Sequence, residues 1–235
     1  MFFRGDKMEL FRARKEIVEI GKRMYENGLV VAFDGNISIR VEKNRVLATP
    51  QGVCKGELNI DDIVLMDLNG NVFNGAKKPS SEIKMHLVAY NIREDIKAVV
   101  HAHPQYSTAF AVSEFDLSKC VLPEVIATLG AIPKAPYATP STTEVPDSIK
   151  ELVPKCDAML LQNHGVLTFG EDLKQAYYRL ETVEHFARIY YYAMNIGQIN
   201  YLSKEDVEKI MEVRKKLGYP GRNVPCIVCD VTQCK

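Results

Sequence analysis

The sequence predicts a single domain of the α/β or α+β class. Segments with apolar residues at helical spacing lie near both ends of the chain, and short β-branched runs bounded by turn residues lie between them. No internal repeat, linker or low-complexity segment divides the 235 residues. We therefore expect one domain rather than two.

The first third of the chain is predicted to be a helix followed by antiparallel strands. Residues 10–27 carry apolar residues at helical spacing, and Gly28 is a helix stop. Asn69-Gly70 is a strong hairpin turn signal. Two hairpins are expected, with strands at residues 37–41, 45–49, 63–68 and 71–73.

Helices and strands are predicted to alternate in the rest of the chain. Ser80 and Ser81 can cap one helix, and Ser203 can cap the last one, which ends before Gly218. Residues 122–143 are rich in Pro, Gly and Thr and are expected to be loop and short strand. The other expected elements are strands at 97–103, 157–161 and 166–169 and helices at 105–112 and 172–195.

The charge balance excludes two classes of protein. The chain carries 30 Lys and Arg against 30 Asp and Glu, and 46% of its residues are apolar. A groove that follows nucleic-acid phosphates normally leaves a basic surplus, and a chain too polar to form a core normally carries a strong charge of one sign. We expect a globular protein without a nucleic-acid partner.

A membrane partner is not expected either. Apolar runs such as residues 158–161 are far shorter than the roughly 20 residues that a spanning helix needs. Charged residues begin at Arg4, so the N-terminus offers no apolar stretch typical of a secretion signal. A cytoplasmic location is the resulting expectation.

The six cysteines are too few for a disulfide scaffold. Cys54, Cys120 and Cys156 stand singly among apolar or loop residues, where we expect them to pack. The other three lie together in the tail, at Cys226, Cys229 and Cys234. The first pair there has metal-ligand or redox spacing, but no nearby residue completes four structural ligands. A tail without catalytic purpose is expected.

Two of the five histidines lie two residues apart in a predicted strand. His101 and His103 alternate with Val100 and Ala102, so a strand directs both imidazoles to one face. Pro104 ends the strand and places His103 at its end, where functional residues concentrate. Two metal ligands and two polar residues on a solvated face explain this pattern equally well.

A third histidine favours the metal interpretation. His164 stands in a tight turn between the apolar residues 159–161 and 166–167. Three nitrogen ligands without a fourth protein ligand are typical of a catalytic zinc, which keeps one position open. His86 and His185 lie within predicted helices, where we expect ordinary, partly buried residues.

Glu82 is the candidate general acid or base beside such a metal. It follows Ser80 and Ser81 in the first turn of a predicted helix, where backbone N–H groups and hydroxyls form an anion site. Taken alone, this segment is better explained as a helix cap. Gly35-Asn36 and Gln51-Gly52 are turns by default, and they can bind phosphate if they converge on the serines.

Taken in order, six short motifs resemble the class II aldolase/adducin family, and most closely its L-fuculose-1-phosphate aldolase branch. They are Asp34-Gly35-Asn36-Ile37-Ser38, Thr49-Pro50-Gln51-Gly52, Lys78-Pro79-Ser80-Ser81-Glu82, Val100-His101-Ala102-His103-Pro104, Ala135-Pro136-Tyr137-Ala138-Thr139-Pro140 and Leu161-Gln162-Asn163-His164-Gly165. Each motif is weak, but their ordered combination is specific. The similarity covers about residues 8–220 of one domain at 1–235 and leaves out the tail at 221–235.

The resemblance implies a three-layer α/β/α fold with a central, largely antiparallel sheet. It also implies a homotetramer with active sites at subunit interfaces and one zinc ion per subunit. His101, His103 and His164 match the family's zinc ligands, and Glu82 matches its catalytic glutamate, which can also contact the metal. The residues that match the phosphate-binding positions are Gly35, Asn36, Gln51, Gly52, Ser80 and Ser81.

The implied reaction is the reversible cleavage of a ketose 1-phosphate to dihydroxyacetone phosphate and an aldehyde. Zinc acts as a Lewis acid on the two substrate oxygens next to the bond that breaks. Glu82 moves the proton at the carbon that becomes nucleophilic. A fixed phosphate site holds the substrate in this geometry.

Two features bear on the branch of the family. The L-ribulose-5-phosphate 4-epimerase branch has Asp after the two serines, so Glu82 favours the aldolases. The catalytic tyrosine of the fuculose branch is missing from residues 122–127, where Glu124 either approaches the zinc or caps a helix. A second family tyrosine aligns with Leu217, two residues before Tyr219. Zinc-dependent epimerases, decarboxylases and dehydratases of sugar phosphates remain alternatives.

A non-catalytic scaffold is an alternative of a different class. The adducins have an aldolase-like domain that serves assembly and needs no zinc ligands. All three histidines and the glutamate are present in this chain. This favours an enzyme.

Overall fold

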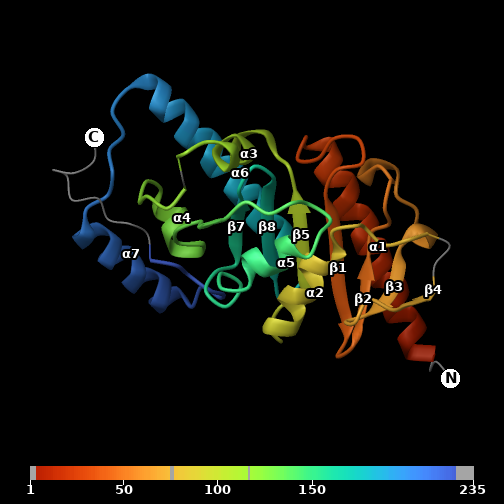
Figure 1. Cartoon of the computed structure of the whole chain (residues 1–235). Helices are drawn as coiled ribbons and strands as arrows, with labels where there is room; N and C mark the ends of the chain where they lie inside the picture. The colour runs from red at the N-terminus through yellow and green to blue at the C-terminus, as the bar shows by residue number, and fades with distance from the viewer. Residues whose placement is uncertain (1–3, 75–76, 116, 226–235) are drawn as a thin grey trace.

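A computed structural model describes residues 4–74, 77–115 and 117–225. An eight-stranded sheet in the order β4-β3-β2-β1-β5-β8-β7-β6 forms its centre (Figure 1). The strands are β1 (Asn36–Glu42), β2 (Arg45–Ala48), β3 (Val64–Asp67), β4 (Val72–Asn74), β5 (Ala98–Ala102), β6 (Lys134–Ala135), β7 (Ala158–Leu161) and β8 (Gly165–Gly170). All neighbouring pairs of these strands are antiparallel except β6 and β7. The expected central, largely antiparallel sheet is confirmed.

The junction of β1 and β5 joins two halves of this sheet. The first half contains the hairpins β1–β2 and β3–β4, and the second half contains β5 to β8. Across the junction, Asn36 pairs with His101 and Ser38 pairs with Val99. Two residues of the predicted site therefore face each other where the halves meet.

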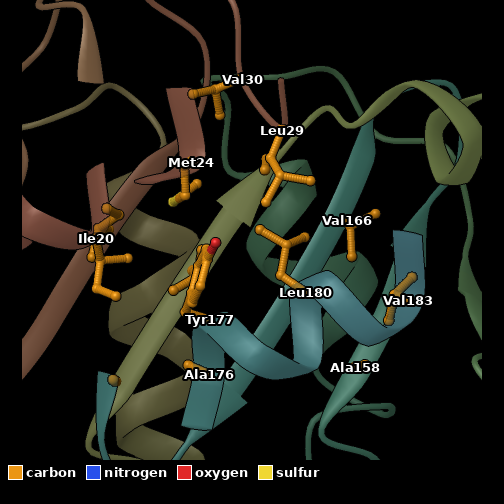
Figure 2. Packing of buried hydrophobic residues seen from close by; sticks show 14 of the residues in the cluster. Ile20, Met24, Leu29, Val30, Ala158, Val166, Ala176, Tyr177, Leu180 and Val183 are labelled. Carbon is orange, nitrogen blue, oxygen red and sulfur yellow. The ribbon is translucent and has the colours of Figure 1, made fainter. Parts of the chain in front are cut away.

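Helices cover both faces of the sheet. On one face lie α1 (Arg4–Glu26), α3 (Gln105–Val112) and α6 (Leu173–Ile196), and on the other lie α2 (Ile83–Ile92) and α5 (Glu144–Ile149). Strand residues alternate between two separate cores, so Val100 packs toward α6 whereas Val99 packs toward α2. Figure 2 shows the first core, where Met24 of α1 lies beside Tyr177 of α6. The arrangement has three layers.

Two further helices pack on each other near the end of the sheet that carries β6 and β7 (Figure 1). They are α4 (Pro123–Thr128) and α7 (Lys204–Leu217). The guanidinium of Arg214 on α7 is buried and donates to the carbonyl of Ala127 on α4. The predicted caps of α7 are confirmed, because Ser203 accepts from the Asp206 backbone and Gly218 is left-handed with φ of 66°.

The structure corrects three predicted boundaries. Residues 122–143, expected to be mostly loop and short strand, contain α4, which begins at Pro123, a first-turn position where the missing N–H costs nothing. Glu82, rather than a serine, is the N-cap of α2, because residues 80–82 form a turn in which Ser80 accepts from the Glu82 backbone. Strand β5 ends at Ala102, so His103 lies just outside it.

The described residues contain no helix that is long and apolar enough to cross a membrane. The three clustered cysteines, Cys226, Cys229 and Cys234, lie outside the described residues. Of the remaining cysteines, Cys120 and Cys156 are buried as expected, and Cys54 is half-buried.

Candidate metal centre

Neighbouring strands bring the three histidines together. His101 lies on β5 and is fully buried, and His103 follows at the end of that strand. His164 lies in the turn between β7 and β8, and β8 pairs with β5. Gly165 allows this approach, because a Cβ at that position would lie 2.4 Å from the Ala102 carbonyl oxygen. The ring centroids of the histidines are 4.6–4.9 Å apart.

Glu82 reaches the histidines from the N-terminus of α2. Its Oε1 lies 3.0 Å from His164 Nε2, and its Oε2 lies 3.4 Å from His101 Nε2. Asn36 fixes this carboxylate, because its amide Nδ2 donates to Oε2 at 2.9 Å. One ligand atom from each of Glu82, His101, His103 and His164 lies within 4.8 Å of the others. These four predicted residues form one cluster.

The hydrogen bonds of the outer ring nitrogens indicate that a cation fits this cluster. His101 Nδ1 lies 2.8 Å from the Val166 carbonyl oxygen, and His103 Nδ1 lies 3.2 Å from the Asp34 carboxylate. Both partners accept hydrogen bonds, so Nδ1 carries the proton in each neutral ring and Nε2 presents a lone pair. The two Nε2 atoms are 3.0 Å apart. Two lone pairs at this distance repel each other unless a cation lies near both.

The protonation states of Glu82, His101 and His103 at neutral pH are those of metal ligands. Burial lowers the pKa of His101 well below its ordinary value, and burial together with His164 lowers the pKa of His103. Burial opposes ionisation of Glu82, but the neighbouring His101, His164 and His103 outweigh it and lower the pKa of this carboxyl. Neutral imidazoles and an ionised carboxylate suit a divalent ion such as zinc.

A row of polar side chains continues from the cluster between β1 and α2. Asn36, Ser38 and Arg40 alternate along β1, and they meet Glu82, His86 and Tyr90, which are one helical turn apart. The Ser38 hydroxyl lies 2.7 Å from His86 Nδ1 and 2.8 Å from the Tyr90 hydroxyl. His86 is fully buried rather than partly buried as expected, whereas His185 is exposed.

The predicted phosphate-binding segments converge beside the cluster. The Gln51 backbone donates to the Lys78 carbonyl at 2.9 Å, and the Ser80 backbone donates to the Thr49 carbonyl at 3.1 Å. Thr49 also accepts from the Ile37 backbone through its hydroxyl at 3.1 Å. The structure therefore joins the three chain segments that hold Gly35, Asn36, Gln51, Gly52, Ser80 and Ser81.

Two further candidates lie outside the four-residue cluster. Glu124 is exposed in the first turn of α4, and its backbone carbonyl accepts from the Thr128 hydroxyl at 2.7 Å. Tyr219 follows α7 and is 42% exposed. It lines a cavity of about 340 Å³ together with Tyr178 and Pro220. Glu124 is not among the four clustered residues of the described chain.

Two charged residues of this region, Asp34 and Lys55, were not predicted as site residues. Asp34 contacts His103, and Lys55 is 1% exposed, with its ammonium donating to the Phe33 and Val53 carbonyls. Asp34 stands within a noted motif, and its place before Gly35-Asn36 is the one available signal. A lysine is normally exposed, so no pattern predicts the burial of Lys55, the first residue of a 3-10 helix at Lys55–Glu57.

Comparisons with known proteins agree with this geometry. The family described as Class II Aldolase and Adducin N-terminal domain matches residues 15–191. The 5-deoxy-D-ribulose 1-phosphate aldolase of Bacillus thuringiensis serovar kurstaki is 36% identical over 214 residues, which cover 90% of this chain and 99% of that protein. The 3-oxo-tetronate 4-phosphate decarboxylase of Pectobacterium atrosepticum is 32% identical over 203 residues, covering 85% and 92%.

A solved structure shows the same fold. An L-fuculose 1-phosphate aldolase superposes with a TM-score of 0.79 and 36% identity, covering 87% of this chain and 96% of that one. The family match spans most of the chain and includes all four clustered residues. The chain therefore belongs to the class II aldolase and adducin family, and it is a metal-dependent lyase of that family.

Proposed function

We propose that this protein is a zinc-dependent aldolase that reversibly cleaves a ketose 1-phosphate, of the L-fuculose 1-phosphate type, to dihydroxyacetone phosphate and an aldehyde. The observation that carries the proposal is the cluster of Glu82 with His101, His103 and His164. Beside it lie candidate phosphate-binding loops that backbone hydrogen bonds join to one another. Relatives named as ketose-phosphate aldolases support the substrate class.

The three histidines would hold the metal, and Glu82 can complete the set before substrate binds. Zinc, when bound, supplies a Lewis acid for the substrate oxygens next to the bond that breaks. Three imidazoles leave a position open for these oxygens, as catalytic zinc sites do. The low exposure of His101 and His164 keeps bulk water away from this side of the site.

Glu82 moves the proton in the proposed reaction. On cleavage, the electron pair of the broken C–C bond stays with the carbon beside the carbonyl, and Glu82 delivers a proton to that carbon; in the reverse direction its carboxylate removes the proton. The lowered pKa keeps Glu82 ionised, which is the form that the second role requires. Asn36 donates to Oε2, so the carboxylate is held in place.

The phosphate would be held by local groups rather than by a basic surface. Gly35, Gly52 and the serines before Glu82 offer backbone N–H groups and hydroxyls on converging loops. The net charge of zero is compatible with this arrangement, because such a site needs no surplus of lysine and arginine. A fixed phosphate keeps the reacting carbons near Glu82.

The aldehyde side needs a separate group that accepts the substrate hydroxyl proton. Glu124, which lies where the family tyrosine is missing, and Tyr219 are candidates for this role, and the cluster within one chain consists of Glu82, His101, His103 and His164. We infer a homotetramer in which the active site lies at a subunit interface, so that such a residue comes from a neighbouring copy. Sedimentation velocity at several protein concentrations tests this assembly.

A panel of ketose 1-phosphates incubated with the zinc-loaded protein tests the activity. We expect dihydroxyacetone phosphate from at least one of them, and a loss of about 10²–10⁴-fold in rate for Glu82→Gln. The exposed Glu151 provides a matched control as Glu151→Gln, which should retain the parent rate. Absence of dihydroxyacetone phosphate from every substrate would falsify the aldolase proposal.

The decarboxylase named among the relatives is the second candidate. The same panel, extended to oxo-acid phosphates and assayed for carbon dioxide, epimerisation and loss of water, separates the lyases and epimerases of the family. Carbon dioxide release that depends on Glu82 would favour the decarboxylase. If no zinc co-purifies with the protein and His103→Ala leaves every measured property unchanged, a scaffold is favoured instead.

A further inference from the structure

Four consecutive residues connect the parts of the candidate site. Phe33 accepts a hydrogen bond from Lys55, Asp34 contacts His103, Gly35 lies against His101, and Asn36 donates to Glu82. We call residues 33–36 the connecting segment. Each of its members contacts a different functional group.

Asp34 determines which nitrogen of His103 faces the cluster. Its Oδ2 lies 3.2 Å from His103 Nδ1, while Nε2 of the same ring lies 3.0 Å from His101 Nε2. The Asp34 side chain is 43% exposed, so solvent screens its charge and the pair contributes little to folding stability. A carboxylate on the outer nitrogen of a metal-binding histidine fixes the tautomer and orientation of the ring.

Lys55 holds the segment that carries Asp34. Its ammonium donates to the Phe33 carbonyl at 3.0 Å and to the Val53 carbonyl at 2.8 Å. Val53 follows Gln51-Gly52, so the lysine links the connecting segment to a candidate phosphate-binding loop. Burial of a lysine is costly and lowers its pKa, and two carbonyl partners compensate for part of this cost.

Gly35 leaves the connecting segment no room to move toward β5. Its φ is 72°, in the left-handed region that favours glycine. A Cβ here would lie 2.8 Å from the His101 carbonyl oxygen and 2.7 Å from Val30 Cγ1. The segment is therefore seated directly on the strand that carries two of the histidines.

We propose that Asp34 and Lys55 are positioning residues of the metal site. Asp34 holds His103 with Nε2 directed at the metal, and Lys55 holds the backbone next to Asp34 while tying it to the phosphate-binding loop. The identity of the metal rests on the proposed function, but the test of the positioning role measures metal binding alone. A missing aldolase activity would therefore leave the positioning role standing, and an unchanged zinc affinity would leave the aldolase proposal standing.

Zinc affinity of the full chain, measured by competition with a chromogenic chelator, tests the role of Asp34. We expect Asp34→Ala to weaken zinc binding about 10–100-fold. Asp34→Asn keeps an acceptor for the Nδ1 proton and should restore part of the loss. Asp147→Ala, which removes another exposed carboxylate, serves as the matched control. Zinc affinity of Asp34→Ala within threefold of this control would overturn the proposal.

The double variant tests whether Lys55 acts through Asp34. Lys55→Met should weaken zinc binding, and the combination with Asp34→Ala should lose less than the product of the two single losses. Lys55→Gln retains an amide donor and is the second variant if Lys55→Met does not fold. If the losses of zinc affinity multiply fully, or if the folded Lys55 variant keeps the parent zinc affinity, the role of Lys55 is contradicted.

The metal-free Asp34 variants should unfold at the same temperature as the metal-free parent.

Discussion

The two faces of β1 differ in chemistry although they belong to the same strand. Ile37 and Ile39 enter the core formed with α1 and α6, where the cluster of buried side chains is apolar. On the other face, Asn36, Ser38 and Arg40 meet the polar row of α2. The apolar face depends on shape and volume, whereas the polar face depends on matched hydrogen bonds.

This difference separates folding stability from site geometry. Apolar burial is non-directional, so the first face can stabilise the fold without fixing any atom of the site. Hydrogen bonds are directional, and the row from Asn36 to Tyr90 places Glu82 at the head of α2. Substitutions on the two faces should therefore differ in kind as well as in size.

The largest loss of stability is expected on the apolar face. Leu180 is fully buried in that core (Figure 2), and Leu180→Ala should lower the free energy of unfolding by about 2–5 kcal/mol. Zinc affinity of the folded variant should stay at the parent value. Urea unfolding and zinc titration at fixed protein concentration check both statements. A weakened zinc site would show that the faces are not separable.

A smaller loss is expected when the polar row is broken. Ser38→Ala leaves His86 Nδ1 and the Tyr90 hydroxyl without their shared partner, at a cost of about 1–3 kcal/mol. Urea unfolding measures this loss. Ser148→Ala, which removes a hydroxyl bonded to a carbonyl within its own helical turn, is the control. Equal losses in the two variants would rule out a special contribution of the row.

The buried His86 in the polar row should make folding stability depend on pH. Burial lowers the pKa of His86 to about 3, whereas an unfolded histidine titrates near 6.5. The unfolded chain thus binds a proton below about pH 6.5 that the folded chain does not bind, so stability falls as pH falls, by about 1.4 kcal/mol per pH unit for this group.

Urea unfolding of the metal-free protein between pH 7 and pH 5 measures this slope. His86→Gln should reduce the slope of unfolding free energy against pH by up to about 1.4 kcal/mol per pH unit, the value for one proton, because the neutral amide does not titrate. His185→Gln, at an exposed histidine, is the matched control. An identical slope in parent and His86→Gln would refute the assignment.

The smallest change in the free energy of unfolding is expected for a solvent-exposed ion pair. Lys15 and Glu19 form an exposed pair at 3.6 Å on α1. Lys15→Ala should change the free energy of unfolding by at most about 0.5 kcal/mol. Urea unfolding measures this change, which is then compared with the loss of unfolding free energy in Ser38→Ala. A change above 1 kcal/mol would show that exposure alone does not distinguish the two kinds of contact.

Local signals explain which parts of the fold were predictable. Asn69-Gly70 sets a tight turn and Ser203 caps a helix, and both act through their immediate neighbours. The pair His101 and His103 was visible because strand periodicity relates them. The helix at Glu124 was one of two open interpretations, because the proline and the short length of α4 resemble a loop, and α4 packs against α7.

The rest of the site depends on contacts that are distant in sequence. Lys55 is buried because it meets the carbonyl of Phe33, which is 22 residues away, and His86 is buried because it meets Ser38, which is 48 residues away. Composition and spacing contain no information on such pairings. The motif order implied the members of the cluster, whereas only the fold shows how Asp34 orients one of them.

The position of the cluster on the β1–β5 junction has a kinetic consequence. Asp34 and Asn36 belong to the first half of the sheet, and the three histidines belong to the second. Each half can pair its own strands early, but closing the junction requires a long loop and is entropically expensive. The complete set of contacts around a bound ion thus exists only after the halves have joined. An ion that binds the completed site more tightly than the separate halves would slow the opening of this junction.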